Sequence, residues 1–300
     1  MALIRENITL APLTYYKIGG PARYYAQPES AQHLAELVDF LRDKKVPYFV
    51  LGAGSNVLMH DEGFGGLVIH TSKLDRTLTG TGTALQVGAS VMVIHLLRHC
   101  MSEGLAGFEL LVGIPGSLGG VLYMNAGTQK GEIESTITNV TAYDLATKTE
   151  RTISREALKY SYRAQHYLRP HEIILRGTLE GRKSTPQAVQ AEVQALLATR
   201  KKAQPIDKPS CGSVFKNPDP ATKLQAWKLI ADAGLRGHRV GNAQISELHT
   251  NFIVNLGGAK ASDVTALIDL AKSRVKAQCG VVLEEEVRTI AREGGKLFEE

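Results

Sequence analysis

Two loops rich in glycine and small polar residues are the clearest chemical signal in this chain. Backbone N–H groups in such loops can converge on an anion, and glycine leaves no Cβ in the way. One loop of this kind is more often only a turn. Two of them favour a ligand with a long anionic middle, such as the pyrophosphate of a dinucleotide. The candidate residues are Gly52, Ala53, Gly54, Ser55 and Asn56 in the first loop, and Ile114, Pro115, Gly116, Ser117, Gly119, Gly120, Asn125, Ala126 and Gly127 in the second.

Neither loop fits the common nucleotide-binding or nucleophile motifs. The first loop lacks the third glycine of the dinucleotide fingerprint, and Asn56-Val57-Leu58 does not open an amphipathic helix, which argues against a Rossmann turn. No Gly-Lys-Ser/Thr follows either loop, which argues against a P-loop. Pro115 stands where a nucleophile elbow before Ser117 would need glycine.

Ser213 and Asn217 lie in a segment that could present polar groups to one ligand. If residues 211–218 are extended, Ser213, Phe215 and Asn217 face the same way. The plainer alternative is a strand that ends before a proline turn. The order Cys211-Gly212-Ser213 lacks the second cysteine of a cysteine-protease signature, so that reaction is rejected.

Arg163 and Glu286 are the two charged candidates. Arg163 follows closely spaced tyrosines and could hold a carboxylate through two parallel hydrogen bonds, or be a surface arginine on Tyr162. Strand alternation would put Glu286 on one face with Glu284 and Arg288, together with Val282 and Ile290. That face could instead be a solvated one with an ion pair. His249 could contact a phosphate or sugar, although a hydrogen-bonded structural histidine is the plainer interpretation.

Composition places the chain among ordinary globular proteins. Three hundred residues predict two or three domains, and three widely spaced cysteines predict no disulfide framework and no metal site, as in a reducing cytoplasm. There is no signal-peptide pattern and no apolar run of membrane-spanning length. Residues 201–280 carry 12 Lys and Arg against 6 Asp and Glu, so the net charge of +5 is concentrated there. This suits a domain that binds an anionic ligand, whereas the dense basic runs of a nucleic-acid arm are absent.

Periodicity and capping residues predict a mixed α+β architecture with a boundary near residue 205. Helices are expected at 30–45, 90–100, 186–202, 223–233 and 263–278, with Ser30, Thr185 and Ser262 as caps. Strands are expected at 47–51, 66–70, 137–144, 172–179, 251–255 and 281–290, with β character at 77–89. The proline-containing stretch 204–209 is the expected linker.

These segments, taken in order, resemble the UDP-N-acetylenolpyruvoylglucosamine reductase family. The resemblance runs nearly end to end, through residues 14–22, both glycine loops, 160–163, 211–218, 237–246, 251–255 and 283–288. The short stretch between Arg163 and Leu179 has little room for the tyrosine-bearing loop of a longer subclass, so the chain is similar to the shorter one. Residues 128–131 depart from the family's usual Ala-Tyr-Gly wording.

The resemblance implies a fold, ligands and a place of action. It implies a bipartite FAD-binding domain of the vanillyl-alcohol-oxidase (PCMH) type in residues 1–72 and 73–204. A smaller α+β substrate domain follows in 205–280, and a last strand in 281–300 returns to the FAD half. Non-covalent FAD, NADPH as reductant, and UDP-N-acetylglucosamine enolpyruvate as substrate are the implied partners. The implied setting is peptidoglycan precursor synthesis in the cytoplasm by a monomer or weak oligomer, with no metal, nucleic acid or membrane.

The resemblance also implies roles for individual residues. The family's catalytic positions fall on Arg163, Ser213 and Glu286. Hydride from NADPH would reach the enolpyruvyl ether through FAD, Arg163 and Glu286 would hold the substrate carboxylate, and Ser213 would supply the proton. Arg288 joins the two loops in cofactor binding, and the substrate-binding residues are Tyr162, Lys216, Asn217 and His249. The alternatives are another flavin-dependent oxidoreductase of the same fold and a non-catalytic UDP-sugar-binding module.

Overall fold

A computed structural model describes residues 4–219 and 224–298. The first unit is a four-stranded sheet in the order β1 (Ile4–Thr9), β2 (Pro21–Ala26), β5 (Phe64–His70) and β3 (Tyr48–Leu51). Strands β2, β5 and β3 are parallel, and β1 is antiparallel to β2. Helix α1 (Ala31–Lys44) begins where predicted, because the Ser30 side chain accepts the His33 N–H. Its apolar stripe packs against this sheet and against the ends of β11 and β15, which joins the first unit to the second.

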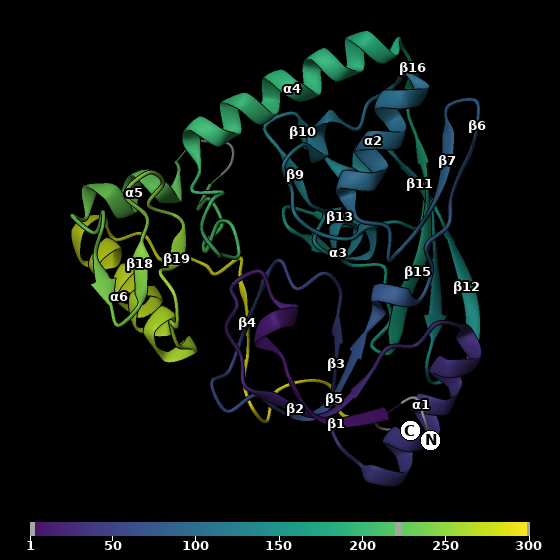
Figure 1. The fold of residues 1–300 in the computed structure, drawn as a ribbon, viewed down its shortest axis with the longest axis horizontal. Coiled ribbons are helices and arrows are strands. Elements are labelled where there is room, and N and C mark those ends of the chain that lie inside the picture. The colour runs from purple at the N-terminus through teal and green to yellow at the C-terminus, as the bar shows by residue number, and fades with distance from the viewer. Residues whose placement is uncertain (1–3, 220–223, 299–300) are drawn as a thin grey trace.

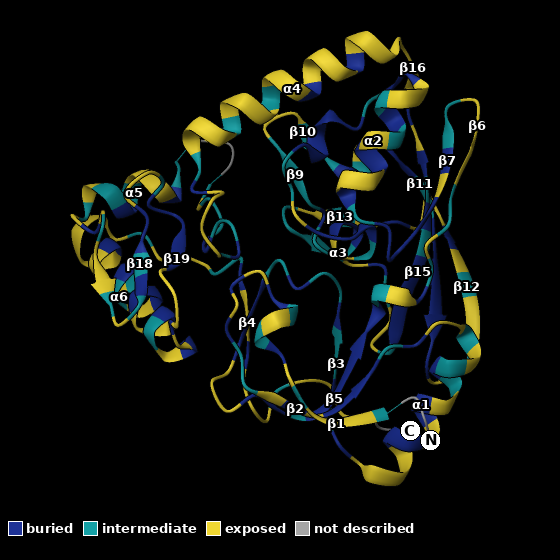
Figure 2. Ribbon diagram, in the orientation of Figure 1, coloured by how far each residue is buried: buried dark blue, intermediate teal, exposed yellow. Residues whose placement is uncertain are grey.

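The second unit is an antiparallel sheet in the order β12 (Thr149–Ser154), β11 (Ile137–Asp144), β15 (Glu172–Glu180), β7 (Ala84–Gly88) and β6 (Leu78–Thr81). Helices α2 (Val93–Glu103), α3 (Leu118–Tyr123) and α4 (Pro186–Ala203) lie on one side of it (Figure 1). Strands dominate the buried interior, whereas the outer face of α4 is exposed (Figure 2).

Short elements connect these layers and carry much of the site. They are the pairs β8 (Leu105–Ala106) with β16 (Arg182–Lys183), β9 (Gly127–Thr128) with β10 (Gly131–Glu132), and β13 (Tyr160–Ser161) with β14 (Ala164–Gln165). Four 3₁₀ turns span Ala11–Leu13, Thr71–Lys73, Glu109–Leu111 and Ile133–Ser135.

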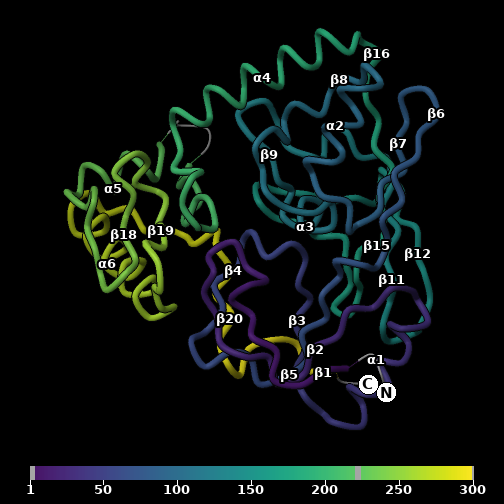
Figure 3. Tube along the Cα trace, in the orientation of Figure 1, coloured from purple at the N-terminus to yellow at the C-terminus, as the bar shows by residue number. Residues whose placement is uncertain are grey.

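The third unit is a small α+β layer after the linker. It contains α5 (Ala226–Asp232), the sheet β17 (Arg239–Val240), β18 (Ala243–Ile245) and β19 (Ile253–Asn255), and helix α6 (Ala261–Cys279). The chain then leaves this unit, and β20 (Arg288–Ile290) pairs in parallel with β4 (Val57–Met59) of the first unit (Figure 3). The mixed α+β architecture predicted from periodicity is confirmed. No helix in the two described ranges has the length and apolar character needed to cross a membrane.

The predicted strand over 281–290 is mostly wrong. Only Arg288–Ile290 forms a strand, and Glu285 makes an isolated bridge to Phe215. The N–H groups of Glu286 and Val287 both donate to the carbonyl oxygen of Val214, which breaks the alternation expected of a strand. Consequently Val282 and Ile290 do not share a face, since Val282 is 68% exposed and Ile290 is buried.

Several predicted boundaries also shift by a few residues. Helix α6 begins at Ala261 and not after Ser262: Asp263 accepts the Lys260 N–H locally, and Asp61 of the first unit accepts the N–H groups of Ala261 and Ser262. Helix α2 begins at Val93 after Met92, and the 251–255 strand shortens to β19. Of the predicted helix at 223–233 the structure shows Ala226–Asp232, and Lys223 lies outside the described residues.

Replacing Asp61 with alanine should destabilise the junction between the first and third units. Burial raises the pKa of Asp61, but the hydrogen bonds from Ala261 and Ser262 outweigh burial and lower it overall. Loss of this cap should cost about 1 kcal/mol of unfolding free energy at neutral pH, seen as a lower melting temperature. Because the folded-state pKa is depressed, this stabilisation exists above the unfolded pKa and disappears as the pH falls through the folded one. The gap between the Asp61→Ala and parent melting temperatures should therefore close on acidification.

The control for this experiment is Asp43→Ala, which removes an exposed carboxylate near the end of α1. It should change the stability by less than about 0.5 kcal/mol at any of these pH values. Equal melting temperatures for Asp61→Ala and Asp43→Ala would contradict the cap.

Candidate active site

One cavity of about 1300 Å³ brings the separate sequence signals together. Its lining comes from all three units and from both glycine loops. The predicted residues that line it are Gly52, Ala53, Gly54, Ser55, Asn56, Ile114, Pro115, Gly116, Ser117, Gly119, Gly120, Ala126, Gly127, Tyr162, Arg163, Ser213, Asn217, Glu286 and Arg288. Three predicted residues, Asn125, Lys216 and His249, are absent from the cavity lining.

The two glycine loops meet in a reciprocal contact. A Cβ on Gly52 would lie 3.2 Å from Ser117 Oγ, and a Cβ on Gly116 would lie 3.2 Å from Ser55 Oγ. Gly54 has a φ of +69°, and a Cβ there would lie 2.2 Å from the carbonyl oxygen of Leu13. A side chain at Gly52 or Gly116 would crowd the serine of the other loop, and one at Gly54 would strike the backbone at Leu13.

The space between these loops fits a phosphate-bearing ligand. Ser117 Oγ is buried and has no hydrogen-bond partner within the described part of the chain. A Cβ on Gly120 would meet no atom within 4 Å, so the cavity is open at that point. A buried hydroxyl without a partner is costly unless a ligand or water satisfies it. The first loop leads into strand β4 and not into a helix, which confirms that it is no Rossmann turn.

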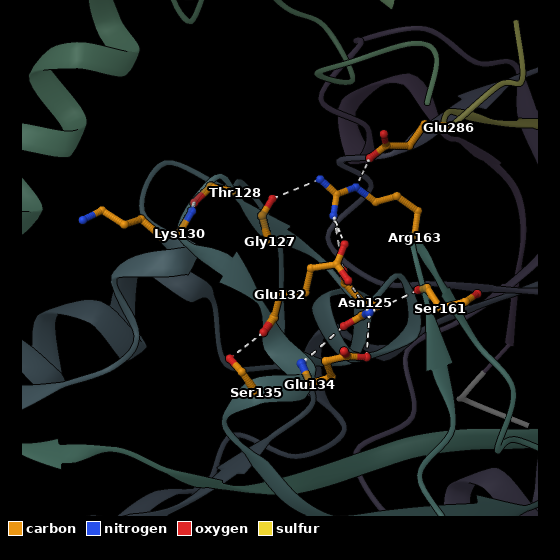
Figure 4. Close-up of polar contacts among 10 residues, drawn as sticks. All are labelled: Asn125, Gly127, Thr128, Lys130, Glu132, Glu134, Ser135, Ser161, Arg163 and Glu286. Carbon is orange, nitrogen blue, oxygen red and sulfur yellow. Dashed lines mark hydrogen bonds and ion pairs between the residues drawn. The ribbon is translucent and has the colours of Figure 1, made fainter. Parts of the chain in front are cut away.

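Arg163 occupies the turn of the β13–β14 hairpin and holds two carboxylates. Its φ of 59° is in the left-handed region, which aims the guanidinium into the cavity. Nε donates to Glu286 Oε1 at 2.9 Å, and Nη1 donates to Glu132 Oε1 at 3.1 Å (Figure 4). The two acids approach different edges of the guanidinium, so neither protein carboxylate is held through two parallel hydrogen bonds. The guanidinium carbon also lies 4.9 Å from the Tyr162 ring centroid.

Glu286 is held by its backbone to two other parts of the site. Its N–H donates to the Val214 carbonyl at 2.8 Å, and its carbonyl accepts from Asn56 Nδ2 at 3.0 Å. Burial raises the pKa of the Glu286 carboxyl, while Arg163 and, more weakly, Lys216 oppose the rise. The side chain can therefore take up a proton more readily than an ordinary glutamate.

Ser213 lies in a loop fixed by one buried asparagine. Asn251 accepts the Phe215 N–H at 3.0 Å through Oδ1 and donates to the Phe215 carbonyl at 2.8 Å through Nδ2. The segment is not an extended strand, since only Phe215 forms a bridge, yet Ser213, Phe215 and Asn217 all line the cavity. Asn217 Oδ1 also accepts the Ala226 N–H at the start of α5.

The other predicted contacts lie elsewhere. Lys216 pairs with Glu284. The His249 ring packs against Phe252 and Trp227, and burial lowers its pKa to about 4, so it is neutral at physiological pH. Its Nδ1 has no side-chain or backbone partner among the hydrogen bonds of the described residues, and aromatic rings pack against it.

Sequence reasoning missed Arg200, Glu132 and Asn251. Arg200 lines the cavity near the end of α4, where its Nη1 donates to the Val112 carbonyl at 3.1 Å and its Nε is buried without a partner in the described chain. A signal for Arg200 existed, since the spacing of Val189, Val193, Leu196 and Arg200 places it on the packed face of the helix. Glu132 and Asn251 had no such local signal.

Comparisons with known proteins agree with this geometry. Residues 22–154 match the FAD binding domain model, and residues 204–290 match that of the UDP-N-acetylenolpyruvoylglucosamine reductase C-terminal domain. The reductase of Heliobacterium modesticaldum is 41% identical over 95% of this chain and 90% of that protein. That of Trichlorobacter lovleyi is 42% identical over 91% of this chain and 88% of that protein. The crystal structure of the Thermus caldophilus enzyme superposes with a TM-score of 0.80 at 34% identity, covering 95% of this chain and 99% of that one.

The likeness therefore extends through the FAD-binding part and the C-terminal part alike, and the fold is a bipartite FAD-binding domain with a smaller α+β domain appended. The chain is an FAD-dependent oxidoreductase and belongs to the UDP-N-acetylenolpyruvoylglucosamine reductase family.

Proposed function

We propose that Arg163, Glu286 and Ser213 carry the NADPH-dependent reduction of UDP-N-acetylenolpyruvoylglucosamine to UDP-N-acetylmuramate in this chain. The observation that carries the proposal is the convergence of a guanidinium, a carboxyl and a hydroxyl from distant segments on the cavity that both glycine loops line. When bound, FAD supplies the hydride chemistry, accepting hydride from NADPH and passing it to the substrate's methylene carbon.

The residues proposed to hold FAD are the two loops and the adjoining Arg288. Both loops line the cavity, and the buried Ser117 hydroxyl has no partner among the described residues, so a bound ligand could satisfy it. Arg288 also lines the cavity, with its Nη1 donating to the Tyr123 hydroxyl at 2.9 Å. Asn125 is proposed to support the second loop without touching FAD, since it is fully buried and its amide is bonded within the protein.

Arg163 and Glu286 are proposed to bind the enolpyruvyl carboxylate as a cation and a neutral acid. An ionised Glu286 would repel the substrate carboxylate. Glu286 can therefore face that carboxylate favourably only when it is protonated. The upward shift of its pKa by burial supports that state. Two donors on one carboxylate would stabilise the negative charge that grows there once hydride has been added.

Ser213 is proposed to deliver a proton to the carbon next to the carboxylate. A serine hydroxyl is a weak acid in water, so it needs a fixed position against a strongly basic centre. The bonds between Asn251 and Phe215 supply that rigidity two residues away. Tyr162 and Asn217 are proposed to contact the sugar, and Arg200 the diphosphate, because all three line the cavity. Lys216 and His249 do not line the cavity, so no substrate contact is proposed for them.

We also propose domain limits and a cellular compartment. We take 1–72 and 73–204 as the two parts of the FAD-binding domain, 205–280 as the substrate domain and 281–300 as the returning segment. The cysteines Cys100, Cys211 and Cys279 are free, which supports action in a reducing cytoplasm. We propose a monomer or weak oligomer.

The Gly120→Val variant tests the cofactor part of the proposal. A Cβ at position 120 would meet no protein atom within 4 Å and the position lines the cavity, so the polypeptide should stay folded. FAD binding should weaken roughly ten-fold or more, because filling a fitted site typically costs 1–3 kcal/mol. The measurement is the ratio of bound flavin to polypeptide, with circular dichroism to check the fold. The control is Ala191→Val on the exposed face of α4, and a full flavin complement in Gly120→Val would contradict the assignment.

The Ser213→Ala variant tests the proton donor. Under anaerobic conditions, NADPH should still reduce the bound FAD at nearly the parent rate. Reoxidation by the enolpyruvyl sugar should slow by about 10²-fold or more, the usual contribution of a positioned acid. Ser210→Ala, the same change three residues earlier and outside the cavity lining, is the matched control.

The same anaerobic experiment separates the alternatives. An oxygen-using flavoenzyme of the same fold would ignore the enolpyruvyl sugar. If both half-reactions of Ser213→Ala match those of the parent enzyme, Ser213 is not the acid.

A further inference from the structure

We infer that Glu132 is a positioning residue: it holds and neutralises Arg163, which leaves Glu286 free to meet the substrate carboxylate as an uncharged acid. The inference rests on the roles proposed above for Arg163 and Glu286. It concerns a carboxylate that nothing in the loop sequence had singled out.

The guanidinium of Arg163 is almost fully occupied by the protein. Of its five N–H groups, Nε–H serves Glu286, those on Nη1 serve Glu132 and the Asn125 carbonyl at 3.4 Å, and one on Nη2 serves the Gly127 carbonyl at 3.1 Å. The contacts of the described residues thus leave one N–H of Nη2 for a substrate. A second bond to the substrate carboxylate must come from another donor, and Glu286 can be that donor only when protonated.

Glu132 is fixed by a closed circuit of hydrogen bonds (Figure 4). Its Oε2 accepts from Asn125 Nδ2 at 2.8 Å, and the same amide donates to the Ser161 carbonyl at 3.1 Å, two residues before Arg163. Asn125 is completely buried and has a left-handed φ of 44°. The circuit ties the β9–β10 hairpin to the β13–β14 hairpin, so the carboxylate of Glu132 and the guanidinium keep one relative position.

The charges at this point do not balance once substrate arrives. One guanidinium already faces two carboxylates, and their side chains are only 16%, 18% and 24% exposed for Arg163, Glu286 and Glu132. A substrate carboxylate would bring a second surplus negative charge into a poorly solvated site, and uptake of one proton removes it.

Glu286 is the better site for that proton. Burial raises the pKa of both acids, and Arg163 opposes the rise in each case. Glu132 accepts side-chain N–H groups from both Arg163 and Asn125, whereas Glu286 accepts one from Arg163. Hydrogen bonds to the charged form favour that form, so Glu132 remains the anion. The other titratable or charged groups that act on Glu286 are Lys216 from the Ser213 loop and Tyr162 from the hairpin, and Glu134 acts on Glu132.

The test compares Glu132→Gln with Glu134→Gln in the FAD-loaded enzyme. Both changes remove one carboxylate that contacts Asn125, but only Glu132 touches Arg163. Without the Glu132 charge, Arg163 is left with Glu286 alone, so Glu286 should stay ionised to a lower pH. In the pH profile of the substrate half-reaction, the rate should fall on the alkaline side as Glu286 loses its proton. The pH of this fall, the alkaline limb, should then be lower by about one unit. Reduction of FAD by NADPH should change less than about two-fold, and Glu134→Gln should keep the parent limb.

Two further variants make the test decisive. Glu132→Asp keeps the charge but shortens the arm, so it should slow the substrate half-reaction and leave the alkaline limb in place. This variant also decides the matter if Glu132→Gln fails to fold. A limb unchanged in Glu132→Gln, or shifted in Glu132→Asp, would overturn the inference. Glu286→Gln should abolish the limb, and its persistence there would instead refute the role proposed for Glu286.

Discussion

The ion pair between Arg163 and Glu286 joins residues 123 positions apart and sits where the other parts of the site meet. The backbone of Glu286 bonds to Asn56 in the first glycine loop and to Val214 beside Ser213. A shift of Glu286 would therefore move the serine loop and the glycine loop together. Breaking a buried pair by removing one partner typically costs 3–5 kcal/mol, because the remaining charge is left uncompensated. The main effect of the pair is therefore to fix the positions of these segments relative to one another.

Backbone strain gathers around the same pair. Arg163 and Asn125 both adopt left-handed φ values, which for a long side chain such as arginine is uncommon. Each such residue costs on the order of 1 kcal/mol or more and persists only where its surroundings hold it. Here the surroundings are three carboxylates, from Glu132, Glu134 and Glu286, which accept from the side chains of these two residues. These contacts offset the cost of the backbone strain, and they hold the guanidinium in its orientation toward the cavity.

The sequence predicted elements whose signals are local. Helix α1 with its Ser30 cap, helix α4 with Thr185 before Pro186, and strand β11 fall within a residue or two of their expected limits, because periodicity and capping act over a few residues. The prediction failed where a distant atom decides the local structure. The Val214 carbonyl interrupts the strand predicted at 281–290, and Asp61, 200 residues before Ala261, accepts the first N–H groups of α6. Glu132 could not be found for the same reason, since its partner Arg163 reaches it only through the packing of two hairpins.

The elements that carry the chemistry are the shortest ones in the fold. The long strands and helices build separate cores in the second and third units and in the first sheet. Arg163 and Glu132, in contrast, belong to two-stranded hairpins with two residues in each strand, and Ser213 belongs to a loop. Such short pieces cannot hold their geometry through propensity or burial alone. Asparagine side chains replace that support: half-buried Asn56 and buried Asn125 and Asn251 each bridge a reactive segment to a distant backbone atom. An amide suits this task because it donates and accepts without adding charge to a site that already holds more carboxylates than guanidinium groups.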